Sequence, residues 1–559
     1  MLLKLHNKLF STLLISTLIF SMLPLIANAE IPWETSADQP TNKPWTITFN
    51  KPVDRNSVGA NTVFVVDAAG NKVKSEVLTD GDKVIILPPN GGYTPSTTYS
   101  LHVTNGVRNS DDTPLKESVI KKFSIVEADP TYDTATLRSD GSTTISKSFA
   151  TYNEAIAALT VGQVILYDDA IIKMDSGIVV TKPTVDSVLT IIYSDQNFRN
   201  EATYVIDDTE LEYVESTDRY VKVKVAGNPG FIKHANSTLL PWTTVKDKRS
   251  YYSTRNGILT HSIYSNKTGT FSSYQAGNTP SFMNDGERYY SWDGSHFFDS
   301  NGTQVGTGYQ YFQFLPARSK TNYTAEEIDA YILTTLKSLE ADYPNDPTYR
   351  NAAEKSKLIG LGAFLKQVEE EQQINALLIL ALAQHESTYG LSKRAQQFNN
   401  LFGLKVYDDR PVPEYFETVE ENILELVNAY LNKNYIPPNN AYAYGAIFGN
   451  KAVGFNVKYA ADPYWGSKAA GHMYRIDKLM GGKDLAKPYT IGLTTEALNV
   501  RSGPGTNNTL AYRYAKTGIP VIIIEPVIPL PWLKVISDAV GYDELFVHGD
   551  YVKEIPIVK

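Results

Sequence analysis

The sequence predicts a multidomain protein in which a mainly helical domain is flanked by all-β domains. Its 559 residues are enough for about three to five domains of roughly 100–200 residues each. With 42% hydrophobic and 20% charged residues, the composition is that of a folded protein. Apolar residues alternate at period two in the first and last parts of the chain, but recur at helical spacing from about 320 to 480.

The N-terminal segment, residues 1–29, has the features of a signal peptide. Lys4 and Lys8 precede an apolar stretch, and small residues at 27–29 supply a cleavage site. The stretch is short for a membrane span, which is the alternative interpretation. No second long apolar segment follows in the sequence. We therefore expect a secreted protein that begins near Glu30 and has no membrane segment after cleavage.

Charge and cysteine content narrow the classes of function. The chain has 52 basic and 61 acidic residues, a net charge of −9, and removal of the leader would take away two further lysines. An acidic protein is a poor candidate for binding nucleic acid. A secreted chain without cysteine is held together by packing alone, which is common among proteins that Gram-positive bacteria export to the cell exterior. The eight histidines are scattered and form no His-x-x-x-His pair, so we expect no metal and no cofactor.

Residues 31–127 are predicted to form a β-sandwich. Segments at 45–49, 63–66 and 83–87 alternate between apolar and polar residues, and Gly-, Asn- and Pro-rich turns separate them. The stretch "TITFNKPVD…TVFVVDAAGNKV…VIILPPNGGYTPSTTYSLHVTNGV" resembles the bacterial Ig-like domains of surface-layer and wall proteins. That resemblance implies a fold but no chemistry.

Residues 131–250 are predicted to be rich in β-structure, with a short helix at 152–159. The stretch 209–241 alternates strongly and has Gly227 and Gly230 at its turns. It resembles a degenerate set of bacterial SH3-like strands, although an unassigned β-rich spacer is an equal alternative. The sequence does not indicate a function for this region.

A Tyr-rich segment leads into the helical domain, and we place both within 251–484. After strands and loops up to about 315, Thr324 and Glu327 form a capping box at the start of an amphipathic helix. A second helix is predicted at 352–370 and a third from Ile374. Further helices follow at about 419–433 and 466–480.

The C-terminal segment, 488–557, returns to the β pattern. Its stretch "LNVRSGPGT" resembles the signature of bacterial SH3 domains, in which Ser-Gly-Pro-Gly makes the first tight loop. The usual Gly-Trp-x-x-Val strand stands here as "PWLKV" at 531–535. The resemblance implies a domain that binds cell-wall peptide or glycan, and a non-binding β-barrel spacer is the alternative.

One helix of the central domain carries the candidate chemistry. Residues 376–383 are apolar without interruption, and the sequence then changes to Gln384, His385 and Glu386. Burial raises the pKa of a carboxyl group and keeps it protonated near neutral pH, and the negative end of the helix dipole acts in the same direction. A protonated carboxyl is what general-acid cleavage of a glycosidic bond requires. Most glutamates at helix ends are simply solvated, so spacing alone does not establish this role.

Three separated motifs strengthen that interpretation. "HESTYG", "NNLFG" and "YAADPYWG", within about 320–480, resemble the glucosaminidase domain of glycoside hydrolase family 73, which has a lysozyme-like fold. The resemblance implies that Glu386 is the catalytic acid. It also implies a peptidoglycan autolysin of the mannosyl-glycoprotein endo-β-N-acetylglucosaminidase type, acting on the β-1,4 bond between N-acetylglucosamine and N-acetylmuramic acid. We expect a monomer associated with a Gram-positive type of cell wall, with bacterial peptidoglycan as partner.

Residues of the same motifs are candidates for binding the sugar chain. Asn399 or Asn400 would hold loop backbone or sugar hydroxyls, and aromatic rings would supply flat faces for pyranose rings. For Phe402 and Trp465, core packing is an equal alternative, whereas His385 is expected to be a packed neighbour. Aromatic residues of the 250–315 segment either extend a saccharide groove or pack against the helical domain. The candidates for binding the sugar chain are Asn400, Phe402, Tyr407, Tyr459, Tyr464 and Trp465.

The sequence leaves a second catalytic group open. A mechanism with two carboxyl groups needs another acid across the cleft, and their separation decides retention or inversion. Candidates are Asp408, Glu414 and Glu417, but the substrate's 2-acetamido group is an alternative nucleophile. Two rival functions also stay open at this stage: a lytic transglycosylase, and a non-catalytic protein that binds the wall.

Overall fold

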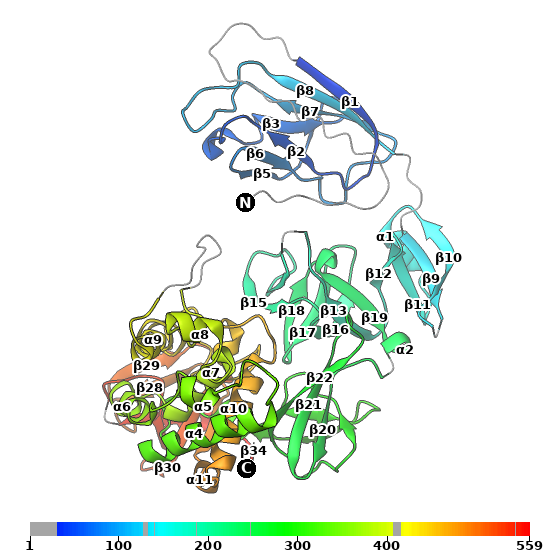
Figure 1. Cartoon of the computed structure of the whole chain (residues 1–559). Helices are drawn as coiled ribbons and strands as arrows, with labels where there is room; N and C mark the ends of the chain where they lie inside the picture. The colour runs from blue at the N-terminus through cyan, green and yellow to red at the C-terminus, as the bar shows by residue number, and fades with distance from the viewer. Residues whose placement is uncertain are drawn as a thin grey trace. The chain divides into compact units, whose positions relative to one another are not determined.

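The computed structural model describes residues 31–126, 132–138, 140–185, 187–245, 247–405, 415–542 and 544–559. Two compact units make up the chain (Figure 1). One contains the residues up to Tyr132 with Ser148–Glu154, and the other contains Asp133–Lys147 and Ala155–Lys559. The predicted signal peptide lies outside the described residues.

The first unit is built of two sheets around one core. The larger sheet has the order β1-β8-β7-β3-β4, with β1 parallel to β8, and the smaller has the order β2-β6-β5. Trp45, Tyr93, Tyr99 and Phe123 meet at its centre, with ring centroids 4.9–5.6 Å apart along their contacts. The strands are β1 (Ile31–Gln39), β2 (Trp45–Thr48), β3 (Val63–Val66), β4 (Lys72–Val73), β5 (Val77–Asp80), β6 (Lys83–Ile86), β7 (Thr98–Val103) and β8 (Val119–Ile125).

The second unit begins with two further sheets. A four-stranded sheet has the order β10-β9-β11-β12, and a seven-stranded sheet has the order β15-β14-β18-β17-β16-β13-β19. Helix α1 (Tyr152–Ala158) forms where a short helix was predicted. The strands are β9 (Tyr132–Leu137), β10 (Thr143–Phe149), β11 (Gln163–Tyr167), β12 (Ala170–Lys173), β13 (Gly177–Thr181), β14 (Leu189–Tyr193), β15 (Glu201–Ile206), β16 (Glu210–Ser216), β17 (Val221–Val225), β18 (Asn228–Ile232) and β19 (Ser237–Pro241).

The Tyr-rich segment folds as strands and short helices. Its main sheet has the order β22-β21-β20-β23, and β24 pairs with β25. The last strand, β26, pairs in parallel with β34 near the end of the chain. The elements are α2 (Trp242–Val245), β20 (Tyr251–Arg255), β21 (Ile258–Tyr264), β22 (Phe271–Asn278), β23 (Arg288–Tyr289), β24 (His296–Phe298), β25 (Gln304–Thr307), β26 (Tyr309–Gln310) and α3 (Tyr311–Phe314).

Helices then gather around α7, a helix that is buried over most of its length (Figure 1). The predicted capping box is confirmed at α4, where Thr324 and Glu327 bond each other's backbone amides. The helices are α4 (Ala325–Asp342), α5 (Ala352–Lys355), α6 (Gly362–Gln372), α7 (Ala376–Ser387), α8 (Lys393–Phe398), α9 (Val419–Glu425), the π-helix η3 (Leu426–Tyr435), α10 (Trp465–Leu479) and α11 (Lys483–Ala486).

The prediction of one helix at 352–370 is wrong, because two helices occupy this stretch. The Ser356 hydroxyl donates to the Tyr389 carbonyl oxygen at 2.7 Å and accepts from the Leu358 amide, which draws the backbone out of the helix. Gly360 follows in the left-handed region, with φ of +78°. A tertiary contact therefore overrides the local helical pattern.

The C-terminal strands form a seven-stranded sheet in the order β29-β28-β32-β31-β30-β27-β33. Ile491, Ile522 and Ile555 join the core of the helical domain. The SH3 assignment of this segment stays a prediction. Its strands are β27 (Thr490–Thr494), β28 (Leu498–Arg501), β29 (Leu510–Tyr514), β30 (Pro520–Val527), β31 (Trp532–Ile536), β32 (Leu545–His548), β33 (Val552–Glu554) and β34 (Ile557–Val558).

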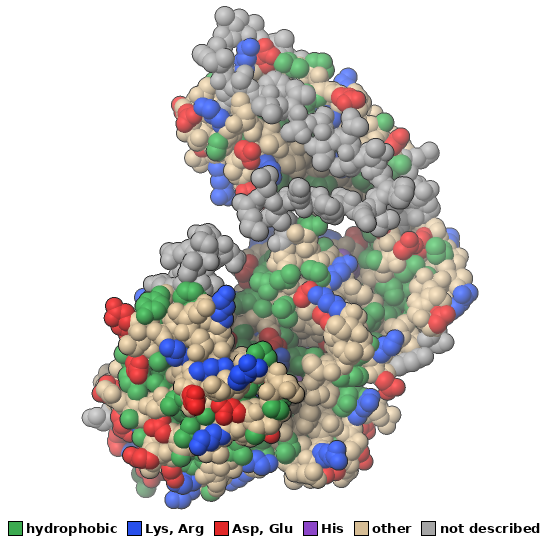
Figure 2. All heavy atoms as spheres, in the orientation of Figure 1, with side chains coloured by type: hydrophobic (Ala, Val, Ile, Leu, Met, Phe, Trp, Pro, Cys, Tyr) green, Lys and Arg blue, Asp and Glu red, His purple; other side chains and the backbone are tan. Residues whose placement is uncertain are grey.

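Two surface properties bear on partners. Within the described parts of the chain, no helix combines the length and the apolar character needed to span a bilayer. On the face seen in Figure 2, acidic and basic side chains are interspersed over the described residues.

Candidate active site

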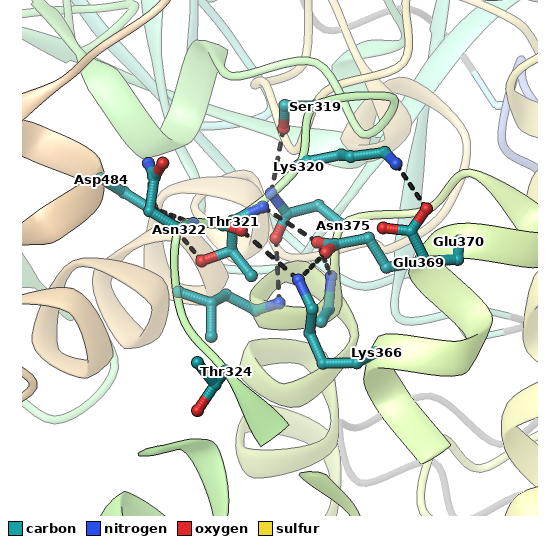
Figure 3. Close-up of polar contacts among 12 residues, drawn as sticks. Ser319, Lys320, Thr321, Asn322, Thr324, Lys366, Glu369, Glu370, Asn375 and Asp484 are labelled. Atoms are coloured by element: carbon teal, nitrogen blue, oxygen red, sulfur yellow. Dashed lines mark hydrogen bonds and ion pairs between the residues drawn. The ribbon is translucent and has the colours of Figure 1, made fainter. Parts of the chain in front are cut away.

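Helix α7 starts in a buried polar network (Figure 3). The Asn375 side chain caps the helix by accepting hydrogen bonds from the amides of Leu377 and Leu378. The Glu369 carboxylate from α6 accepts from the amides of Thr321 and Ala376, each at 3.0 Å. Since the first amides of a helix have no partner within the helix, these bonds satisfy donors that would otherwise be buried and unpaired.

Two neighbouring groups complete the network. Lys366 forms an ion pair with Glu369, whose side chain is fully buried. Asp484 of α11 accepts from the Thr321 hydroxyl at 2.7 Å and from the Asn322 amide at 2.7 Å. The start of α7 is therefore fixed to α6 and to the 319–322 segment, and Asp484 holds that segment in turn.

The other end of α7 turns sharply after Ser387. Thr388 and Tyr389 both have left-handed backbone, with φ of +52° and +58°. The Ser387 hydroxyl donates to the Ala383 carbonyl oxygen and accepts from the Gly390 amide. The helix thus ends within one residue of Glu386 and leaves this side chain in the last turn.

Glu386 lies in the last turn of the helix, as the sequence predicts. Its carboxyl group is exposed along a cleft, but protein on the other sides disfavours its charged form and raises its pKa. A hydrogen bond from Trp465 Nε1 to Glu386 Oε1, 2.7 Å long, partly opposes this rise, as does the charge of Arg394. Burial is the larger effect.

The cleft beside Glu386 has a volume of about 420 Å³. Among the described residues that line it, Glu386 is the one carboxyl group. The rings of Tyr459 and Trp465 stack within it, with centroids 4.6 Å apart and planes inclined by 27°. Burial raises the pKa of Tyr459, and the nearby Glu386 charge adds to the rise. The lining residues are Glu386, Phe402, Gly403, Leu404, Lys405, Tyr430, Tyr435, Tyr459, Ala460 and Trp465.

Two aromatic residues of the cleft, Tyr430 and Tyr435, were missed by the sequence interpretation. Both come from η3, which is a π-helix. In a π-helix the i→i+5 hydrogen bonds bring residues five apart toward the same face, whereas in an α-helix they point apart. A pair of tyrosines spaced by five was the only available signal, and it has no meaning under α-helical periodicity.

Asn400 requires a correction, because it does not face the cleft. Its side chain is 1% exposed and bonds both ways with Leu404, donating to the carbonyl oxygen at 2.8 Å and accepting from the amide at 3.0 Å. It also accepts from the Asn422 side chain. Asn400 therefore holds the loop that carries Phe402, rather than a sugar. Asn399 likewise bonds backbone, at Phe416 and Glu417.

Tyr464 also lies elsewhere than predicted. Its ring packs edge-on against His261, with centroids 4.6 Å apart, and it lines a small cavity with Glu210 and Tyr252. Its neighbour Trp465 is the first residue of α10 and points into the Glu386 cleft. Successive residues at a helix start diverge by about 100°, so the two rings of this motif serve different surroundings.

The loop that carries Tyr459 is held by the seven-stranded sheet that runs from β15 to β19. At its edge strand β15, the Thr203 hydroxyl donates to the Val457 carbonyl oxygen at 2.6 Å, and the Tyr204 hydroxyl donates to the Lys458 carbonyl oxygen at 3.0 Å. The Ile206 amide donates to the Ala461 carbonyl oxygen at 2.9 Å. These contacts bracket Tyr459 on both sides.

A buried lysine supports the same loop. Lys451 donates to the carbonyl oxygens of Asn456 and Ala460, at 2.9 and 2.5 Å. Burial lowers the pKa of Lys451 to about 7. The nearby Asp462 charge opposes that change.

The remaining predicted residues fall into three groups. Tyr407, Asp408 and Glu414 lie outside the described residues. Glu417 is exposed and is not among the described residues that line the cleft. His385 packs near Trp465 and His472, and burial lowers its pKa to about 4. Among the described residues, no group of three or more His, Asp or Glu side chains is placed to hold a metal ion.

Comparison with known proteins identifies two domains of this chain. Residues 362–478, which include α7 and the Tyr459 and Trp465 segments, match the family model of mannosyl-glycoprotein endo-beta-N-acetylglucosaminidase. Residues 24–125 match the bacterial Ig-like domain. The chain therefore contains a glucosaminidase domain and an Ig-like domain, and these matches support a glycoside hydrolase.

Two curated relatives bear the same description. A protein of Streptococcus pneumoniae serotype 4, strain TIGR4, named as an endo-beta-N-acetylglucosaminidase, is 33% identical over 273 residues, or 48% of this chain and 36% of that protein. Its counterpart in strain R6 is also 33% identical, with 34% of its length covered. The chain spans about a third of the length of these relatives.

Solved structures give weaker likenesses. S. aureus autolysin E is 17% identical, with 30% of this chain and 72% of that chain covered and a TM-score of 0.21. The S-layer protein rSbsC is 12% identical, with 50% and 59% covered and a TM-score of 0.15.

Proposed function

We propose that this protein is a secreted peptidoglycan hydrolase of glycoside hydrolase family 73. It cleaves the β-1,4 bond between N-acetylglucosamine and N-acetylmuramic acid, with Glu386 as general acid. The observation that supports this most is one carboxyl group of raised pKa in an aromatic-lined cleft, within the segment that matches the glucosaminidase family.

The bond from Trp465 assigns different roles to the two oxygens of Glu386. An indole N–H only donates, so Oε1 acts as the acceptor and a proton on the carboxyl group resides on Oε2. The raised pKa keeps this proton available toward neutral pH. In the proposed reaction Oε2 donates the proton to the leaving glycosidic oxygen, while Trp465 fixes the orientation of the carboxyl plane.

The aromatic residues supply the binding surface. Tyr459 and Trp465 form a stacked pair next to the acid, and Phe402, Tyr430 and Tyr435 line the remaining wall. Aromatic rings offer apolar faces to the C–H faces of sugar rings, and tyrosine hydroxyls add polar contacts. We infer that the glycan strand lies along these rings with the bond to be cut beside Glu386.

The second step of the reaction has two chemical routes. A carboxyl group of the 406–414 segment, at Asp408 or Glu414, would activate water or attack the anomeric carbon. In the other route, the 2-acetamido group of the substrate attacks instead, and water then opens the cyclic intermediate. Among the described lining residues Glu386 is the one acid, so the described part of the cleft supplies the proton donor and both routes stay open.

A lytic transglycosylase with one glutamate is the second candidate, since a lone acid is compatible with it. The two reactions leave different ends on the glycan. Hydrolysis on the reducing side of N-acetylglucosamine leaves reducing N-acetylglucosamine ends, whereas a transglycosylase leaves anhydro-muramic ends. Mass spectrometry of digested muropeptides separates them, and anhydro ends would overturn the hydrolase proposal.

The flanking domains bear on where the enzyme acts. We propose that it works outside the cell on a Gram-positive type of wall as a monomer. The Ig-like domain and the predicted C-terminal SH3-like domain would hold it there. The net charge of −9 would repel an anionic wall, so attachment would come from specific contacts rather than from bulk charge.

Glu386→Gln is the test of the general acid. The amide keeps the shape and still accepts from Trp465, but it has no acidic proton, so lysis in a zymogram and in a turbidity assay falls by about 10²–10⁴-fold. Glu417→Gln is the matched control, because this exposed acid does not line the cleft, and its activity stays at the wild-type level. Unchanged lysis by Glu386→Gln would end the proposal, and absence of lysis by the wild type would favour a non-catalytic wall protein.

A further inference from the structure

A second and larger cavity lies in the β-rich part of the same unit. Its volume is about 820 Å³, within the range of small-molecule sites, and it shares no lining residue with the Glu386 cleft. Trp242, Tyr290 and Trp292 contribute aromatic walls, and Arg249, Asp293 and His296 contribute polar groups. These residues come from α2 and from the Tyr-rich segment, which the catalytic proposal does not use.

Arg249 is the central polar group of this cavity. Its guanidinium lies 4.9 Å from the ring centroid of Trp242, 4.4 Å from that of Tyr290 and 5.0 Å from that of Trp292. Its Nε donates to the buried Glu210 carboxylate at 3.2 Å. Among the described residues, none accepts a hydrogen bond from its two Nη groups, so these groups keep donors for a ligand although the side chain is only 14% exposed.

Trp242 is the aromatic face that folding does not cover. Its side chain is 41% exposed, although burial of an indole is strongly favourable. At the wall of the cavity, this exposed ring offers a flat apolar face to a ligand. The ring is held in place from one side by Arg249.

The acceptor Asp293 of the cavity is also held in place, by hydrogen bonds from its neighbours. Asp293 accepts from the amides of Ser295 and His296 and from the His296 ring. Burial opposes ionisation of Asp293, but these bonds outweigh it and lower its pKa. The bond to Asp293 is also the main cause of the raised pKa of His296. Groups held in this way are organised before a ligand arrives.

Charge at the cavity is compensated in pairs. Arg249 pairs with Glu210, Lys224 pairs with Glu212 at 3.0 Å, and His296 pairs with Asp293 at 2.6 Å. Asp299, a further acid of the lining, accepts from the amides of its own loop. The lining therefore offers no positive field to an anionic ligand, but it offers many donors and acceptors beside flat apolar faces.

We propose that this cavity is a non-catalytic binding site for an uncharged saccharide, specifically a segment of N-acetylated glycan. Sugar rings stack on the face of Trp242, hydroxyl or acetamido oxygens accept from the Arg249 Nη groups, and hydroxyls donate to Asp293. The site goes beyond the proposed catalysis, because it holds glycan at a place distinct from the bond that is cut.

The test uses the full chain carrying Glu386→Gln, so that the ligand is not consumed. Titration with the N-acetylglucosamine tetramer, followed by calorimetry, should show two classes of site. Adding Trp242→Ala weakens one class by about tenfold or more and leaves the other unchanged, while Trp242→Phe restores much of the affinity. Tyr343→Ala, which removes an exposed aromatic residue of the helical domain outside both sites, changes neither class.

A second variant guards against misfolding of the first. Ser300 lies exposed at the rim, so Ser300→Tyr fills the cavity without removing a contact, and the same site should be lost. When the two substitutions are made in the enzyme that retains Glu386, both variants keep wild-type turnover of a short soluble glycan. This result distinguishes the proposal from the catalytic one. Tetramer binding that both variants leave unaltered, or a cavity that takes only anionic muropeptides, would overturn it.

Discussion

Helix α7 begins in a closed polar network and ends at an open cleft. At its start, the fully buried Glu369 and Asn375 accept hydrogen bonds from backbone amides, and Lys366 compensates the charge (Figure 3). At its end, the Glu386 carboxyl is exposed and its recorded hydrogen bond is the one from Trp465. One end of α7 therefore contacts an acid of α6, Glu369, that is fully bonded to protein, and the other end carries an acid, Glu386, that is left for a substrate.

The two acids contribute to different properties of the protein: Glu369 to the stability of the fold and Glu386 to the proposed chemistry. Bonds to the charged form of Glu369 come from groups that would be buried and unpaired without it, so its loss affects the folded state. Glu386 is held in an environment that disfavours its charge, which is a cost to folding but supplies a proton donor. Substitutions at the two ends should therefore affect different measurements.

Glu369→Ala should have the largest effect on stability. It leaves Lys366 without its buried partner and leaves the Thr321 and Ala376 amides unsatisfied, which costs about 3–5 kcal/mol of unfolding free energy. Urea unfolding followed by tryptophan fluorescence measures this loss. The fraction that remains folded keeps the wild-type pH profile of lysis, because the cleft is not touched.

Glu370→Ala is the matched control for that substitution. Glu370 is the next residue and also pairs with a lysine, Lys320, at 2.6 Å, but both side chains are more than half exposed. Its removal should leave the unfolding midpoint nearly unchanged. Equal destabilisation by the two variants would contradict the role given to the buried network.

Trp465→Phe should have a smaller effect than Glu369→Ala, and this effect should be on catalytic activity. It removes the one recorded hydrogen bond to the Glu386 carboxyl, so kcat falls by about tenfold through loss of orientation. This bond stabilises the carboxylate and lowers the pKa of Glu386, so its removal raises that pKa further. The alkaline limb of the pH–kcat profile should therefore move to higher pH, and a shift to lower pH would refute the assignment.

Much of this site follows from local sequence. The apolar run of α7 followed by Gln384 and His385 placed Glu386 at the helix end, and the structure agrees. Phe402, Tyr459 and Trp465 line one cleft, although Phe402 and Trp465 are also largely buried in the core, and their binding of sugar stays a prediction. Burial, helical periodicity and the change from apolar to polar residues at the end of α7 are properties of adjacent residues. Sequence alone can therefore indicate them.

The sequence could not indicate the directions in which side chains point, or the contacts between residues that are far apart in the chain. Asn400 was expected at the substrate, yet its side chain turns inward to Leu404 because the loop needs its amide bonds. Tyr430 and Tyr435 share a wall only because η3 is a π-helix. Thr203 contacts the Tyr459 loop across 254 positions of sequence, and no periodicity encodes such a contact.

That distant contact leads to the smallest of the predicted effects. Thr203→Val keeps the shape of a buried side chain but leaves the Val457 carbonyl oxygen without its donor, a loss of about 0.5–1.5 kcal/mol. Because the Tyr459 loop is then less well ordered, KM should rise about two- to fivefold, while kcat and its pH profile stay unchanged. Thr190→Val on the adjacent strand β14 is the control, since no described residue bonds its buried hydroxyl, and it should alter neither constant. A fall in kcat with constant KM would mean that β15 acts on Glu386 itself rather than on the ring that binds the sugar.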